Sequence, residues 1–210
     1  MTYRMGDSLQ ERAQHWVDHD PDPETRNEIR ELINNSQWPV LRQYFAEELT
    51  FGTAGLRAAL GPGPARMNRL VVRRATNAVA MHMLESHPTV ETRSVVVGFD
   101  GRHGSRIFAH DAARVFAAHD FLVYLYEDTA PTPQIAHAVR DLNTLGGVMV
   151  TASHNPPGDN GYKVFWSDGA QIVPPHDRLI AAHIDKLVDL STLLLPAMDD
   201  LVARAQVISP

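Results

Sequence analysis

The chain has 210 residues, of which 44% are hydrophobic and 21% charged, so it can bury a substantial core. Its net charge of −6, without a compensating run of Lys or Arg, argues against nonspecific nucleic-acid binding. There is no cysteine, which excludes disulfides, thiolate zinc sites and cysteine nucleophiles. The sequence also has no signal-peptide core and no apolar run of roughly 18 residues, so we expect a cytoplasmic protein with no membrane partner.

Residues 1–50 carry three helical patterns. Ser8 and Glu11 form a capping-box pair ahead of an apolar stripe, and Asp22-Pro23 is a typical helix start. Pro39 indicates a third helix that carries Leu49. We expect this segment to be a helical N-terminal arm that serves packing.

Residues 51–64 contain four glycines and two prolines around Arg57, which excludes a regular helix and favours a loop with some strand character. Residues 66–87 return to a helical period, with Asn68 as the expected cap.

A strand and helix alternation follows. Apolar strands are predicted at 94–99, 121–126 and 147–150, separated by helices that Ser105 and Thr132 cap. Such strands indicate a parallel sheet covered on both faces, whose ligands bind beyond the carboxyl ends of the strands. A hairpin turning at 167–169 and a helix over 177–190 complete the pattern.

The fold class expected from these elements is α/β. We predict a three-layer domain over residues 51–190, with a mainly parallel sheet that the hairpin makes mixed at one edge, flanked by helices and preceded by the arm. Residues 191–210 are expected to link to a further domain.

The segment T-A-S-H-N-P-P-G-D-N-G-Y-K, residues 151–163, places Ser153 just after the third strand of the sheet. It lacks the G-x-S-x-G elbow of serine hydrolases, so a phosphate-carrying hydroxyl is favoured over acyl transfer, although an ordinary loop serine is the alternative. The neighbouring His154 is a candidate to orient groups or transfer a proton, or else a satisfied polar side chain. Asn155 is a candidate phosphate contact.

Three cations accompany this loop. Lys163 lies on the returning strand, where it can pair with phosphate or, if desolvated, act as an acid or base; the alternative is a solvated strand lysine. Arg57 offers a bidentate fork among glycines, or is a surface arginine. Arg102, in the D-G-R string after the first strand, either contacts phosphate or pairs with Asp100.

These strings together resemble the α-D-phosphohexomutase family. T-A-S-H-N-P is similar to its phosphoserine signature, and F-G-T-A-G-L-R, G-F-D-G-R and A-P-T-P occur in the order of its first domain. The longer strings L-T-F-G-T-A-G-L-R and D-N-G-Y-K-V-F-W-S-D-G-A-Q-I-V-P-P-H-D are most similar to the phosphoglucomutase-2 and phosphopentomutase branch. Pro157 stands where a lysine is frequent, which removes one cation.

The resemblance implies a Mg²⁺-dependent phosphosugar mutase of four domains, of which this chain resembles the first. Ser153 matches the phosphoserine, whose phosphate would be one Mg²⁺ ligand; Lys163 and Arg57 match the active-site lysine and arginine, and His154 the histidine after the serine. The other Mg²⁺ ligands would come from a D-G-D-x-D-R loop that these 210 residues lack. Glucose 1,6-bisphosphate or a similar sugar bisphosphate is the implied activator, a phosphorylated hexose or pentose the substrate, and the remaining domains are expected beyond Pro210.

Two rival interpretations remain at this stage. One is a sugar-bisphosphate synthase that uses the same serine, and the other is a non-catalytic phosphosugar-binding domain. In either case we expect the isolated 210-residue chain to be inactive.

Overall fold

A six-stranded sheet forms the centre of the computed structural model, which describes residues 8–185, 195–203 and 207–208. The order is β1-β5-β4-β2-β3-β6, with β2 parallel to β3 and β4, and β6 parallel to β3. β5 is antiparallel to both of its neighbours, β4 and β1, which makes this edge mixed. The strands are β1 (Leu56–Ala59), β2 (Ser94–Phe99), β3 (Leu122–Leu125), β4 (Gly146–Val150), β5 (Asp159–Trp166) and β6 (Val207–Ile208).

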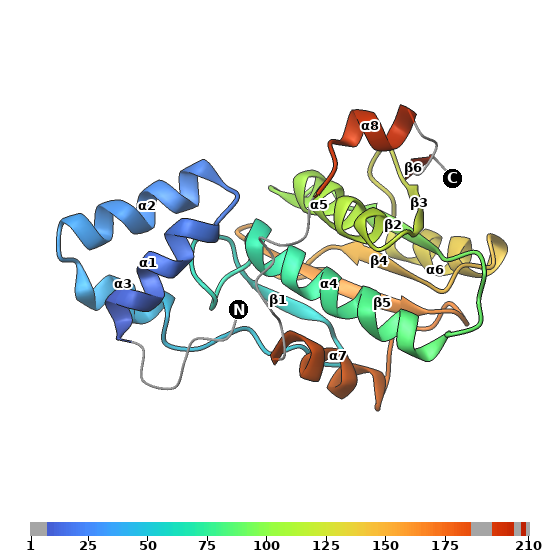
Figure 1. Ribbon diagram of the computed structural model, residues 1–210, viewed down its shortest axis with the longest axis horizontal. Helices are drawn as coiled ribbons and strands as arrows, with labels where there is room; N and C mark the ends of the chain where they lie inside the picture. The colour runs from blue at the N-terminus through green and yellow to red at the C-terminus, as the bar shows by residue number, and fades with distance from the viewer. Residues whose placement is uncertain (1–7, 186–194, 204–206, 209–210) are drawn as a thin grey trace.

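Helices cover both faces of the sheet, as Figure 1 shows, and this confirms the predicted three-layer α/β class. The side chains of β2 alternate between two cores: Val95 and Val97 pack on the side of α4 and α5, whereas Val96 packs with Ile135 of α6 on the other. α7 packs against α4. These helices are α4 (Arg69–Ser86), α5 (Ser105–Ala118), α6 (Thr132–Asp141), α7 (His176–Asp185) and α8 (Met198–Ala203).

The N-terminal arm has the three predicted helices, α1 (Leu9–His19), α2 (Pro23–Asn34) and α3 (Trp38–Tyr44). The Ser8–Glu11 capping box is present. Trp16 is fully buried edge-to-face on Phe45, with 5.9 Å between ring centroids, and both belong to the core that continues under α4 and α5. α3 ends before Leu49, whose N–H donates instead to the Pro64 carbonyl.

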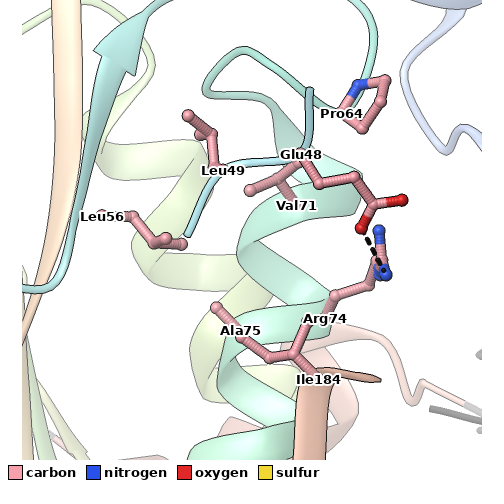
Figure 2. A pocket seen from close by; sticks show the side chains of 8 residues that line it. All are labelled: Glu48, Leu49, Leu56, Pro64, Val71, Arg74, Ala75 and Ile184. Atoms are coloured by element: carbon pink, nitrogen blue, oxygen red, sulfur yellow. Dashed lines mark hydrogen bonds and ion pairs between the residues drawn. The ribbon is translucent and has the colours of Figure 1, made fainter. Parts of the chain in front are cut away.

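The chain leaves the arm across α4, where Glu48 pairs with Arg74 at 3.4 Å (Figure 2). Beside this ion pair lies a hollow of about 20 Å³, which has room for about one water molecule. It is therefore a packing gap and not a substrate site. Its other lining residues are Leu49, Leu56, Pro64, Val71, Ala75 and Ile184.

Several predicted details differ from the structure. Gly104, with a φ of 78°, caps α5, and Ser105 is its buried first residue because its hydroxyl bonds Asp100 instead. Pro131 precedes α6, so Thr132 is already helical. The predicted hairpin has only a bridge, Phe165 to Gln171, as its returning half.

The last part of the chain also differs in detail. β6 pairs with β3, so part of the segment predicted to be a link adds an edge strand to the sheet. The helix predicted over 177–190 is observed as α7, and positions 186–190 lie outside the described residues. Among the residues that the structure describes, no helix has both the length and the apolar character needed to cross a membrane.

Candidate functional site

Ser153 lies in the loop between β4 and β5, just beyond the carboxyl end of β4. Its φ of 62° is in the left-handed region, which non-glycine residues adopt rarely and which recurs at functional sites. Its N–H donates to Thr151 Oγ1 at 2.9 Å, which fixes the turn. Ser153 is exposed, and within the described part of the chain nothing hydrogen-bonds its Oγ. The hydroxyl is therefore held out towards solvent in a defined place.

Asp100 connects this loop to the loop that follows β2. Its Oδ2 accepts from the Thr151 hydroxyl at 2.6 Å, while its Oδ1 accepts from the Ser105 hydroxyl at 2.7 Å and from the Arg102 N–H at 3.1 Å. The Thr151 hydroxyl oxygen in turn accepts from the Ser153 N–H. The Asp100 carboxylate therefore helps to fix the loop between β4 and β5 that carries Ser153, hereafter the serine loop.

Arg102 is committed to the serine loop. Its Nε lies 3.3 Å from Asp100 Oδ2, so the ion pair foreseen as the alternative to phosphate contact is present. Direct contact with phosphate would require the guanidinium to release backbone carbonyls, so in this arrangement Arg102 is a positioning residue. The carbonyls that accept from it are those of Ser153, Asn155 and Pro156, each at 2.8 Å, and of Asp159 at 3.2 Å.

The two residues that follow the serine differ in their surroundings. His154 is exposed, and in the described structure no hydrogen bond holds its ring. The Asn155 amide donates to Asp159 Oδ2 at 2.9 Å, and its backbone N–H to the Ala152 carbonyl at 3.1 Å. Asn155 therefore shapes the loop, whereas His154 is free to meet a ligand.

Lys163 and Arg57 lie on one face of the sheet, because Arg57 is paired with Gly161, two residues before Lys163. Burial lowers the pKa of Lys163, and the neighbouring Arg57 lowers it further, while Asp100 opposes this. The Arg57 Nε is buried and has no acceptor among the described residues. Such a donor is satisfied when an anion or water reaches it. The structure thus brings Asp100, Arg57 and Lys163 into one electrostatic environment.

Sequence patterns missed several residues that build this site. Thr151 and Asp159 look like ordinary loop residues, and Asn160, whose amide donates to the His103 carbonyl and the Ser105 hydroxyl, lies fully buried on β5. The one available signal was that Asp100 and Thr151 each follow the end of a parallel strand, at the same edge of the sheet.

The Mg²⁺ implied by the resemblance fits this chain only in part. A phosphoryl group on Ser153 would offer the oxygen ligands that a hard cation prefers. The carboxylates tied to this loop are already engaged, however: Asp100 with three donors and Asp159 with Asn155. The residues around this loop would therefore supply one ligand, through a phosphoryl group on Ser153, and the site would need carboxylates from elsewhere.

The fold and site define a three-layer α/β domain that presents the exposed Ser153 hydroxyl just beyond β4, with Lys163 on the neighbouring β5 and Arg57 on β1. The comparisons with known proteins agree. The chain belongs to the phosphoglucomutase/phosphomannomutase family, because the family's alpha/beta/alpha domain I matches residues 48–190.

Curated relatives match over most of this chain but little of their own length. Mouse phosphopentomutase is 41% identical and is matched over 84% of this chain and 29% of its own length; Saccharomyces cerevisiae phosphoribomutase is 42% identical, over 81% and 28%. Human glucose 1,6-bisphosphate synthase is 37% identical, over 96% and 36%. The chain thus spans about a third of these relatives.

Solved structures share the fold. A protein of Thermus thermophilus matches with a TM-score of 0.62 and 30% identity, over 72% of this chain and 32% of that one. The phosphoglucomutase parafusin of Paramecium matches with a TM-score of 0.55 and 24% identity, over 67% and 27%, which shows the fold alone.

Proposed function

We propose that this chain is the phosphoryl-carrying domain of a phosphosugar mutase, which moves a phosphoryl group between positions of a phosphorylated hexose or pentose. The observation that carries the proposal is the exposed Ser153 hydroxyl, held by Thr151 and Asp100 at the carboxyl edge of the sheet. Membership of the family and the names of its mutase relatives support it.

In the proposed reaction, a phosphoryl group on Ser153 passes to the free hydroxyl of a sugar monophosphate, giving a sugar bisphosphate such as glucose 1,6-bisphosphate. The other phosphoryl group of that intermediate then returns to Ser153. Phosphoryl transfer depends mainly on positioning and charge stabilisation. Arg57 and Lys163 would supply positive charge, and the lowered pKa of Lys163 suits it to exchange a proton with the sugar hydroxyl.

Mg²⁺, when bound, would stabilise negative charge on the phosphoryl group. Ser153 would provide one ligand through its phosphate, and the remaining ligands would come from domains expected after Pro210. Those domains would also hold the sugar. The division into 1–50, 51–190 and 191–210 and the cytoplasmic location stay predictions.

The test uses the longer protein that includes those domains. With radiolabelled glucose 1,6-bisphosphate, the wild type should take up about one phosphoryl group per chain. Ser153→Ala should lose this labelling and at least about a thousandfold in turnover, the scale at which removal of a covalent nucleophile acts. Ser167→Ala, an exposed loop serine beyond β5, is the matched control. Retained turnover in Ser153→Ala would contradict the proposal.

A synthase that makes glucose 1,6-bisphosphate is the second candidate, favoured by the match to human glucose 1,6-bisphosphate synthase over 96% of this chain. It would use the same serine but take its phosphoryl group from a different bisphosphate donor. Turnover of the longer protein with sugar monophosphates and only catalytic amounts of bisphosphate indicates a mutase, whereas stoichiometric consumption of the donor indicates a synthase. A third possibility, a non-catalytic domain, predicts no turnover in either assay.

A further inference from the structure

Three histidines, His82, His176 and His183, gather with Glu85 where the second half of α4 meets α7, away from the Ser153 loop. Trp166, which stacks on His82 and His176, pairs with Gly146 at the start of β4. Ser153 follows the other end of β4, so the length of that strand, about 15 Å, separates the two ends of the sheet. α7 lies beside α4, as Figure 1 shows. The cluster is thus independent of the proposed phosphoryl site.

The spacing of these residues along the helices makes them converge. His82 and Glu85 are three residues apart on α4, and His176 and His183 are seven apart on α7, so each pair lies on one face of its helix. One ligand atom each of His82, Glu85 and His183 lie within 4.8 Å of one another. The closest of these contacts joins His183 Nε2 to Glu85 Oε2 at 3.0 Å.

A bound ion would rearrange this group, because separations of up to 4.8 Å would shorten and the 3.0 Å His183–Glu85 contact would lengthen slightly. Ligand atoms about 2.0–2.1 Å from a tetrahedral Zn²⁺ are about 3.4 Å from one another. His176 Nδ1 lies 2.9 Å from His82 Nε2, which places a further imidazole beside the group. The geometry is therefore near that of a His, His, Glu metal site.

The environment suits a transition metal better than Mg²⁺. His82 and His183 are only 3% and 8% exposed, while the Glu85 side chain is 65% exposed and leaves a way in for the ion. Imidazole nitrogens favour Zn²⁺, whereas Mg²⁺ prefers oxygen ligands.

We propose that His82, His183 and Glu85 form a structural Zn²⁺ site that fastens α7 to α4. Without metal the same side chains satisfy one another through the His183–Glu85 and His82–His176 contacts. With metal, two helices that are about a hundred residues apart in sequence become joined at one ion. Because binding selects the folded state, Zn²⁺ should raise the unfolding temperature of the chain.

The test is Zn²⁺ binding by the untagged 210-residue chain, measured by competition with a chromophoric chelator and by elemental analysis after dialysis. The wild type should retain about one Zn²⁺, bind Co²⁺ with the intense visible bands of a tetrahedral site, and be unaffected by millimolar Mg²⁺. Loss of a ligand should weaken binding at least as much as loss of an outer-shell partner, about 10–100-fold. The variants are Glu85→Gln, His183→Gln and His82→Gln.

Glu85→Gln is decisive because its exposed side chain can be replaced without disturbing the fold, even if His82→Gln fails to fold. The matched control is His137→Gln, which removes an exposed histidine that pairs with Asp141 on α6. The proposal is overturned if the wild type retains no Zn²⁺, or if Glu85→Gln and His137→Gln bind it equally well. Loss of Zn²⁺ binding without any change in Ser153 labelling would leave the mutase proposal intact.

Discussion

The exposure of the Ser153 hydroxyl depends on its backbone, not on a partner for its side chain. A left-handed φ of 62° turns the residue outward, and the bond from its N–H to Thr151 Oγ1 compensates for part of the strain. Asp100 then holds Thr151 at 2.6 Å. A hydroxyl fixed in this way needs little reorganisation to reach an in-line geometry, which is the main contribution a protein makes to phosphoryl transfer.

Arg102→Gln should loosen this loop. The guanidinium holds four carbonyls and Asp100, and hydrogen bonds from a charged donor contribute about 1.5–3 kcal/mol each when buried, so we expect a net loss of about 1–3 kcal/mol at this partly exposed position. Urea unfolding and hydrogen exchange over residues 152–159 measure both effects. Arg57→Gln is the comparison, because the Arg57 Nε has no hydrogen-bond partner in the described chain. This variant should impair phosphorylation of Ser153 with little loss of stability. Equal stability of Arg102→Gln and the wild type would contradict this role.

The sequence singled out Arg57, Arg102 and Lys163 as candidate partners of the serine loop but did not decide their tasks. Arg57 and Lys163 share one environment, as their motifs predict, because both lie on neighbouring strands at the same edge of the sheet. A guanidinium such as that of Arg102 can bind either a phosphate or backbone carbonyls, and the sequence does not show where the carbonyls lie. In the structure the carbonyls of the serine loop accept hydrogen bonds from Arg102.

At the scale of elements, the buried strands were predictable and the edges were not. The apolar run of β2 has the predicted bounds, because each of its residues is buried. β1 has four residues amid glycines, and its strand character depends on pairing with β5, from a distant part of the sequence. The cap of α5 shifted by one residue, to Gly104, because the Ser105 hydroxyl bonds Asp100 in the preceding loop instead of capping the helix.

At Gly161 of β5, the backbones of β1 and of Thr151 both approach closely. A Cβ there would lie 2.6 Å from the Thr151 carbonyl oxygen and 2.7 Å from that of Leu56, both backbone atoms that cannot move cheaply. We expect Gly161→Ala to lower the free energy of unfolding by about 1–3 kcal/mol, the usual effect of overpacking. Gly158→Ala in the loop itself meets nothing within 4 Å and should be nearly neutral. Equal denaturation curves for the two variants would refute the close approach.

At the scale of the whole molecule, one core joins the arm to the sheet. Trp16 and Phe45 of the arm belong to the same buried cluster as Val95 of β2 and Ile180 of α7. The described chain should therefore unfold as one unit. A change in protonation in the helices that cover the sheet should then also change the free energy of unfolding of the arm.

Acid should weaken this common core through histidines that folding keeps neutral. Burial lowers the pKa of His110, with Arg106 adding to the effect, and burial also lowers the pKa of His119. As the pH falls through about 6.5, the unfolded imidazoles take up protons while the folded ones stay neutral, so the unfolded state is stabilised. Stability should thus decrease from pH 7.5 to 5.5, and level off only below the folded pKa values.

Urea unfolding at pH 7.5, 6.5 and 5.5, with EDTA present to remove metal from the α4–α7 cluster, measures this decrease. His119→Gln should make the pH dependence shallower, because a Gln amide can still donate to Asn77 Oδ1, which His119 Nε2 approaches at 2.7 Å, but takes up no proton. His137→Gln, at an exposed position, should leave that slope much closer to the wild type. A stability that rises towards pH 5.5, or an identical slope for both variants, would show that the half-buried His119 does not link folding to protonation.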